Sequence, residues 1–142
     1  NREDTMSDAL QKLRDVKLPL AQLLGIEFTA AGKDMVEAQL KVRPEICTRP
    51  AILHGGAVMA LADTVGAAAT VLNLPPGAGT TTLESKTNFI SAVPEGDTAV
   101  ARCRPLHRGK TTMVWTTEIT RASDGRLAAV VTQTQMVLAP RG

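Results

Sequence analysis

The chain has 142 residues, a formal net charge of +2, 44% hydrophobic residues and only 2% aromatic residues. This length and composition are those of one globular domain with an aliphatic core. A nucleic-acid partner is not expected, because nucleic-acid-binding surfaces combine a basic field with aromatic rings that stack on bases.

The two cysteines, Cys47 and Cys103, have neither metal-ligand spacing nor a CxxC motif. We expect reduced thiols that pack as small hydrophobic groups, which predicts a cytoplasmic protein. The N-terminal segment NREDTMSDALQKLRD is charged and lacks the apolar segment of a signal peptide.

Residues 1–24 are predicted to form an N-terminal helical segment, with an amphipathic helix over residues 6–24 that is interrupted at Pro19. Residues 25–142 are predicted to form a single domain. Within it, residues 34–42 alternate between apolar and polar side chains, which is typical of a strand with one buried face.

Residues 55 to about 74 predict one long, alanine-rich helix that ends at a Pro-Pro-Gly segment. This helix is apolar almost all round, so other elements must wrap it. The pattern predicts an α+β fold in which a curved antiparallel β-sheet is wrapped around one long central helix. The later strands are expected at residues 80–90, 98–106, 111–121 and 127–138, with hairpin turns at Arg108-Gly109 and Asp124-Gly125.

Residues 51–74 are also long enough for a membrane helix. Asp63, His54, Asn73 and several glycines interrupt this stretch, and patterned strands dominate the rest of the chain. A core helix is therefore favoured, and no membrane partner is expected.

Asp63 is the only charged residue in this apolar stretch. Burying an unpaired carboxylate costs several kcal/mol, so the chain either keeps Asp63 near the surface or uses it. The functional interpretation makes Asp63 a reacting group, and the alternative is an aspartate satisfied by hydroxyls or backbone groups.

The glycines Gly55 and Gly56 begin the helix and leave its first N–H groups uncovered, which suits an oxyanion such as a polarised thioester carbonyl. A tight loop-to-helix turn is the alternative. His54 precedes them and is better explained as a hydrogen-bonding residue than as a base. Asp63 lies eight residues beyond Gly55, roughly 12 Å along a helix. One reacting carbon therefore meets both groups only if they come from two subunits, as in a two-fold dimer with antiparallel helices.

A basic group surrounds the predicted turn at residues 108–109. It could hold the phosphates of a nucleotide-bearing substrate, or it could be a solvated hairpin tip. Its members are Arg102, Arg104, His107, Arg108 and Lys110.

Four segments are LHGGAVMALADTVGAAA, LESKTNFISAVPEGD, CRPLHRGKTTMVWTTEI and DGRLAAVVTQTQMVL. In this order, over about residues 20 to 139, they resemble the PaaI-like (phenylacetyl-CoA thioesterase) group of hotdog-fold acyl-CoA thioesterases. The resemblance implies a hotdog fold, a homotetramer built as a dimer of dimers with sites at subunit interfaces, and no metal or other cofactor.

By this resemblance, the N–H of Gly55 polarises the thioester carbonyl, His54 supports the turn, and Asp63 acts from the partner subunit as nucleophile or general base. Thr82 is implied to orient the water. Thr48 departs from the family, where Asn or Gln is common six residues before the histidine. The implied substrate-binding residues are Thr48, Gly56, Asn88, His107, Arg108, Gly109 and Lys110.

The sequence therefore predicts an acyl-CoA thioesterase that releases a free acid and coenzyme A. Two alternatives remain at this stage. A hotdog hydratase or dehydratase would need a histidine and an acid that face one substrate carbon, and a non-catalytic acyl-CoA-binding protein would bind without turnover.

Overall fold

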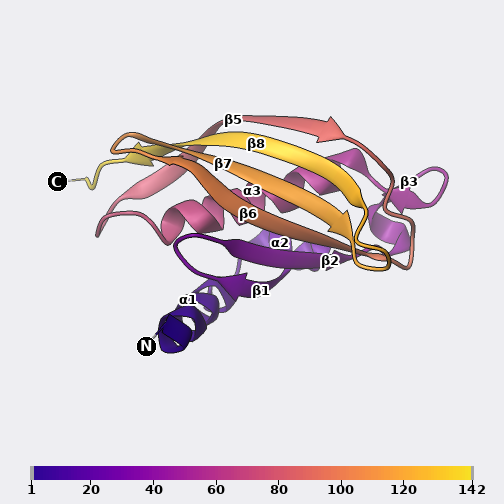
Figure 1. Cartoon of the computed structure of the whole chain (residues 1–142), viewed down its shortest axis with the longest axis horizontal. Coiled ribbons are helices and arrows are strands. Elements are labelled where there is room, and N and C mark those ends of the chain that lie inside the picture. Colours follow the sequence, from indigo (N-terminus) through magenta and orange to yellow (C-terminus); the bar gives the residue numbers. More distant parts are fainter. Residues whose placement is uncertain (1, 142) are drawn as a thin grey trace.

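The computed structural model describes residues 2–141. Six antiparallel strands form one sheet in the order β1-β2-β6-β7-β8-β5, and one long helix, α3 (Gly55–Val71), packs against it (Figure 1). The strands are β1 (Glu27–Ala31), β2 (Val36–Lys41), β5 (Gly79–Phe89), β6 (Thr98–Arg108), β7 (Thr112–Arg121) and β8 (Leu127–Leu138).

The remaining elements are short. A 3-10 turn, η1 (Pro44–Ile46), leads into a two-stranded ribbon of β3 (Cys47–Thr48) and β4 (Ile52–Leu53), which ends where α3 begins. Two helices, α1 (Arg2–Asp15) and α2 (Pro19–Leu24), precede the sheet. Leu13 of α1 is buried in the same core as the sheet, because α1 packs against β1.

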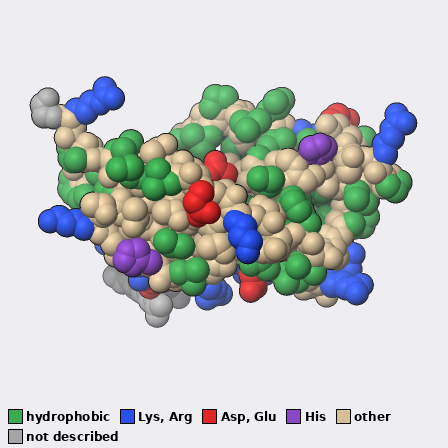
Figure 2. Space-filling view, turned by 90° about the horizontal axis from the view of Figure 1, so that it is seen from above, with side chains coloured by type: hydrophobic (Ala, Val, Ile, Leu, Met, Phe, Trp, Pro, Cys, Tyr) green, Lys and Arg blue, Asp and Glu red, His purple; other side chains and the backbone are tan. Residues whose placement is uncertain are grey.

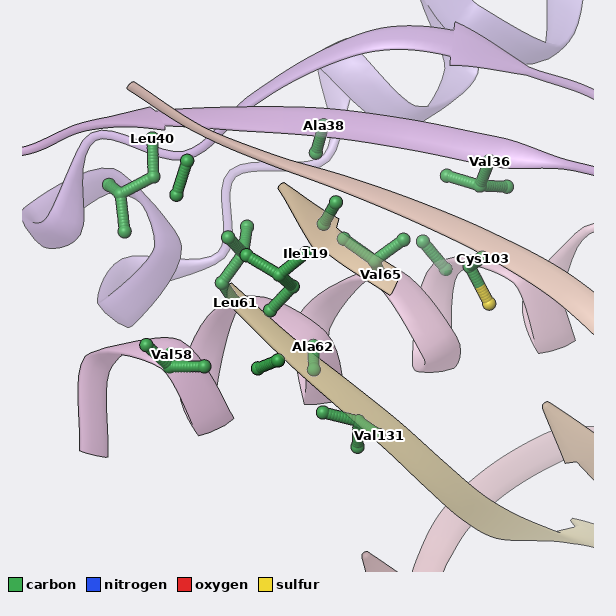
Figure 3. Close-up of a cluster of buried hydrophobic side chains, with 14 of the residues drawn as sticks. Val36, Ala38, Leu40, Val58, Leu61, Ala62, Val65, Cys103, Ile119 and Val131 are labelled. Carbon is green, nitrogen blue, oxygen red and sulfur yellow. The ribbon is translucent and has the colours of Figure 1, made fainter. Parts of the chain in front are cut away.

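The core lies between α3 and the inner face of the sheet (Figure 3). Alternation along β2 buries Val36, Ala38 and Leu40 completely, while the residues between them face outward. From the helix, Leu61 and Val65 fill the opposite side of this layer. Aliphatic periodicity therefore turns the buried faces of the helix and the sheet toward each other.

The predicted α+β class, the four later strands and both hairpin turns are confirmed. The N-terminal helix is two helices, because Pro19 starts a second one. The long helix ends at Val71, three residues before the expected end. Between residues 2 and 141, no helix is long and apolar enough to cross a membrane.

The helix is not wrapped on every side within one chain. A stripe of α3 that includes Met59, Asp63 and Val71 is exposed. The neighbouring strand β5 is the sheet edge next to it, and its hydrophobic residues Leu83 and Phe89 are both more than half exposed. Viewed from the β5 side, hydrophobic side chains are spread over this face and flank acidic ones near its centre (Figure 2).

Gly66 lies where α3 comes closest to β8. A Cβ at this position would lie far inside contact distance of the side-chain amide of Gln133. Gln133 is fully buried and donates from its amide to the carbonyl oxygen of Ala62 at 2.9 Å. The helix can therefore rest on this glutamine only because residue 66 has no side chain.

We expect Gly66→Ala to lower the free energy of unfolding by about 1–3 kcal/mol, because an extra methyl group in a full core forces neighbours to shift. Chemical denaturation measures the change. In a Gln133→Ala background the clash is removed, and the same substitution should become stabilising by roughly 1 kcal/mol through helix propensity. A loss of similar size in both backgrounds would show that Gln133 is not the obstacle.

Candidate functional site

Asp63 lies on the exposed side of α3, facing the edge strand β5. Its carboxylate oxygen Oδ1 accepts a hydrogen bond of 2.7 Å from the hydroxyl of Thr82 on β5. Two residues predicted for the site, 19 positions apart, are therefore in direct contact. The lone carboxylate of the apolar stretch is exposed in the single chain and has a hydroxyl partner.

Two buried glutamines, which were not predicted as site residues, lie behind this pair. Gln135 donates to the Thr82 hydroxyl oxygen at 2.7 Å and to Oε1 of Gln133 at 2.8 Å. Both glutamines are completely buried. Both glutamines lie on the same face of β8 as buried Val131. Alternation along that strand was therefore the sequence pattern that indicates their burial.

The start of α3 forms the second half of the candidate site. Nδ1 of His54 accepts the N–H of Gly56 at 2.8 Å, so the imidazole caps the helix. The N–H groups of Ala57 and Val58 both bond to the His54 carbonyl. Within the described chain, the N–H of Gly55 donates to no protein atom. Only one of the two glycine N–H groups expected to be uncovered is therefore free.

An apolar groove of about 320 Å³ adjoins this free N–H. Thr48 and Gly55 line it together with Phe89 and Ile90 from the end of β5. The Phe89 ring lies so close to the Gly55 backbone that a Cβ there would be 3.3 Å from its Cζ. The groove offers an uncovered donor beside hydrophobic walls, which suits a carbonyl attached to an apolar acyl group.

The two halves lie at different positions along α3, with Gly55 at its first residue and Asp63 near its middle. Gly55 opens the helix near the end of β5, whereas Asp63 meets Thr82 near the start of that strand. Eight helical residues separate them, a rise of roughly 12 Å. Within one chain, the structure therefore does not bring the Gly55 N–H and the Asp63 carboxylate to a common atom.

The basic hairpin between β6 and β7 lies toward the C-terminal end of α3, where Arg108 approaches Asn73 at 3.4 Å. The register runs from Thr82 through Gln135 and Met113 to Arg108 across neighbouring strands. The Arg108 guanidinium is engaged within the chain, because it donates to Asp34 at 2.7 Å and to the carbonyl of Lys33 at 2.9 Å.

Four other predicted residues lie on or near this hairpin or on β5. His107 and Lys110 are exposed beside the turn, and Gly109 donates its N–H to the carbonyl of Thr112 at 2.8 Å. A Cβ on Gly109 would lie 2.9 Å from that carbonyl oxygen, so glycine is required for the turn to close. Asn88 is exposed on β5, toward the Gly55 end.

Neither thiol is suited to nucleophilic attack. Burial raises the pKa of the Cys103 thiol to about 11. Partial burial and the nearby carboxylates of Glu95 and Glu45 also raise the pKa of Cys47. Both thiols are therefore protonated at neutral pH. Residues 2–141 contain no group of three or more His, Cys, Asp or Glu side chains that could hold a metal ion.

Comparison with known proteins adds to this geometry. Residues 51–128 match the family described as the thioesterase superfamily. The proofreading thioesterase EntH of Cronobacter turicensis is 35% identical over 96 residues, which are 68% of this chain and 69% of that protein.

Two solved structures share the fold. Thioesterase HI1161 from Haemophilus influenzae superposes with a TM-score of 0.81 at 30% identity, over 94% of this chain and 90% of that one. The PaaI protein from the phenylacetic acid degradation operon of E. coli has a TM-score of 0.86 at 22% identity, over 96% and 97% of the two chains. The latter likeness concerns the fold alone.

Proposed function

The chain belongs to the thioesterase superfamily and hydrolyses thioesters, and we propose that its substrates are acyl-CoA thioesters. The observation that carries the proposal is the pairing of two features of α3. One end presents a free N–H beside an apolar groove, and the exposed stripe presents a carboxylate held by a hydroxyl.

In the proposed reaction, the acyl chain lies in the groove and its carbonyl oxygen accepts the N–H of Gly55. The partial positive charge of the helix N-terminus then stabilises negative charge as it develops on that oxygen. His54 holds the turn by capping Gly56, so the N–H of Gly55 remains the free donor.

The carboxylate of Asp63 acts on the carbonyl carbon as general base or nucleophile. As a base it takes a proton from water, whose oxygen bonds to the carbon while the carbon–sulfur bond breaks and the thiolate leaves. As a nucleophile it bonds to the carbon while the carbon–sulfur bond breaks and the thiolate leaves, and water then hydrolyses the resulting acyl-enzyme anhydride. In a single turnover in H₂¹⁸O, label enters the Asp63 carboxylate only by the second route.

The active unit is proposed to be a two-fold oligomer in which Asp63 of one subunit meets Gly55 of the other. The exposed stripe of α3 and the edge strand β5 carry exposed hydrophobic side chains, among them Met59, Leu83 and Phe89. Exposed apolar surfaces of this kind commonly mark protein interfaces, and a two-fold axis pairs each half-site with its complement. A dimer of dimers is the proposed full assembly.

Coenzyme A phosphates are proposed to bind at the basic hairpin, through Lys110 and His107. Arg108 is already paired with Asp34, so it contributes positive field and holds the turn. The other substrate contacts proposed are Thr48 and Asn88, from the groove and from β5. Thr48 faces the groove beside Gly55, which supports a contact with the acyl carbonyl or water.

The alternatives are separable by assay. A hydratase would need His54 and Asp63 at one substrate carbon, but Nδ1 of His54 already accepts the Gly56 N–H. Enoyl-CoA hydration without thioester cleavage would support the hydratase, and tight binding of every acyl-CoA without turnover would support a binding protein. A screen of aryl, short-chain and long-chain acyl-CoA thioesters for released thiol tests the thioesterase itself.

Asp63→Asn is expected to lower kcat by at least about a hundredfold, the scale of one positioned acid–base group, with an unchanged fold. Thiol release assays measure kcat, and circular dichroism with sedimentation checks the fold and the oligomer. Asp8→Asn, on exposed α1, is the matched control and should keep wild-type turnover. Near-native turnover of Asp63→Asn would remove Asp63 from the mechanism.

Mixed oligomers test whether subunits share the site. Gly55→Pro deletes the N–H at the first helical position, where proline is well tolerated, whereas Gly55→Ala keeps it and adds the same Cβ. We expect Gly55→Pro to be inactive and Gly55→Ala to be active. Co-expression of Gly55→Pro with Asp63→Asn chains should restore about a quarter of wild-type activity, since half of random dimers are mixed and each has one intact site. No recovery would place each complete site within one chain.

Lys110→Ala should raise KM for acyl-CoA by about tenfold and leave kcat unchanged. A tenfold change in binding corresponds to the free energy of one charge-assisted hydrogen bond to a phosphate. KM for the N-acetylcysteamine thioester of the same acid, which lacks the nucleotide, should not change. Lys12→Ala, on exposed α1, should affect neither substrate. An equal rise in KM for both thioesters would indicate that the hairpin has a structural role.

A further inference from the structure

Four polar side chains form a continuous chain from the core to Asp63. Gln133 donates to the Ala62 carbonyl at 2.9 Å, and Gln135 donates to Gln133 at 2.8 Å and to Thr82 at 2.7 Å. Thr82 donates to Asp63 at 2.7 Å. Both glutamines are fully buried, and one hydroxyl, that of Thr82, connects Gln135 to the proposed reacting carboxylate.

The direction of this chain is fixed at its inner end. The Ala62 carbonyl can only accept a hydrogen bond, so Gln133 must turn its amide nitrogen toward it. The side chain cannot move away, because Gly66 presses against the same amide and the site is fully buried. The Oε1 atom of Gln133 therefore faces Gln135.

Gln135 is fixed in turn. Facing an acceptor on Gln133, it presents its amide nitrogen to both Gln133 and Thr82. Its own Oε1 accepts the hydroxyl of Thr80 at 3.0 Å. Reversing this amide would set two oxygens against each other inside the core and cost the desolvation of both.

This arrangement fixes the direction in which the Thr82 hydroxyl donates. Its oxygen accepts from Gln135, so its one proton is directed to Oδ1 of Asp63. The carboxylate is thereby held through one oxygen, and its second oxygen remains available to a water molecule or a carbonyl carbon.

We infer that Gln133 and Gln135 are positioning residues that fix the Thr82 proton toward Asp63 and so orient the reacting carboxylate. The inference rests on the proposed function of Asp63. It differs from simple satisfaction of buried amides, because it requires the effect of Gln135 to pass through the Thr82 hydroxyl.

The test is a double-mutant cycle read in kcat. Gln135→Met keeps the length of the side chain and removes its donor, and it should lower kcat by about tenfold with KM unchanged. Thr82→Val should lower kcat by at least as much. The double variant should be no slower than Thr82→Val, because the donor then has no hydroxyl to direct. In a Thr82→Ser background, which keeps the hydroxyl, Gln135→Met should again lower kcat.

Thr70→Val is the matched control. Thr70 is fully buried, accepts from Trp115 at 2.8 Å and donates to the Gly66 carbonyl, but it lies outside the chain to Asp63. The Thr70→Val substitution should lower the melting temperature about as much as Gln135→Met does and leave kcat within twofold of the wild-type value. If Gln135→Met does not fold, Gln135→Asn provides the same cycle, since its shorter amide cannot span Gln133 and Thr82.

The outcomes separate the inference from the function on which it rests. Wild-type kcat in Gln135→Met, or losses that multiply in the double variant, would overturn the positioning role while an inactive Asp63→Asn upheld the proposed function. Near-native turnover of Asp63→Asn would overturn both.

Discussion

The close approach of α3 to β8 is the contact on which the rest of the structure depends. Gly66 lets the helix backbone rest directly on Gln133, and Gln133 returns a hydrogen bond to the helix at Ala62. This fixes the height and rotation of α3 over the sheet. Because Asp63 follows Ala62, the same contact sets where the carboxylate meets β5. Packing and the proposed chemistry therefore share one constraint.

Helix geometry imposes the second constraint. A carboxylate and a free N–H eight residues apart on a rigid helix are held apart at a fixed spacing and cannot converge. The hotdog thioesterase fold leaves the stripe around Asp63 and the edge of β5 uncovered, so the chain presents exposed hydrophobic side chains beside the proposed half-sites. Association through that surface would cover the hydrophobic side chains and complete the site together, which links stability of the assembly to catalysis.

The hydrogen bonds behind Asp63 show why polar groups are retained in an aliphatic core. A buried amide costs free energy unless both its donor and acceptor are satisfied, and here each neighbour satisfies the next. The result is a chain with a definite direction, from the Ala62 carbonyl outward to a carboxylate that accepts. Hydrophobic residues of the same volume would fill the space but would remove the N–H that Gln135 donates to the Thr82 hydroxyl oxygen.

The sequence by itself determined the strands, the central helix and the hairpin turns, because periodicity and turn chemistry are local properties. It also predicted a site in the His54–Asp63 segment. Residues 34–42 and 127–138 needed no tertiary information to be recognised as strands. Only the tertiary structure showed that His54 takes up the Gly56 N–H and that Asp34 engages Arg108. It also showed that Gln133 points at Gly66 and Gln135 at Thr82 rather than at solvent. These partners lie up to 74 positions apart in the chain, and the packing of α3 on the sheet decides which of them meet.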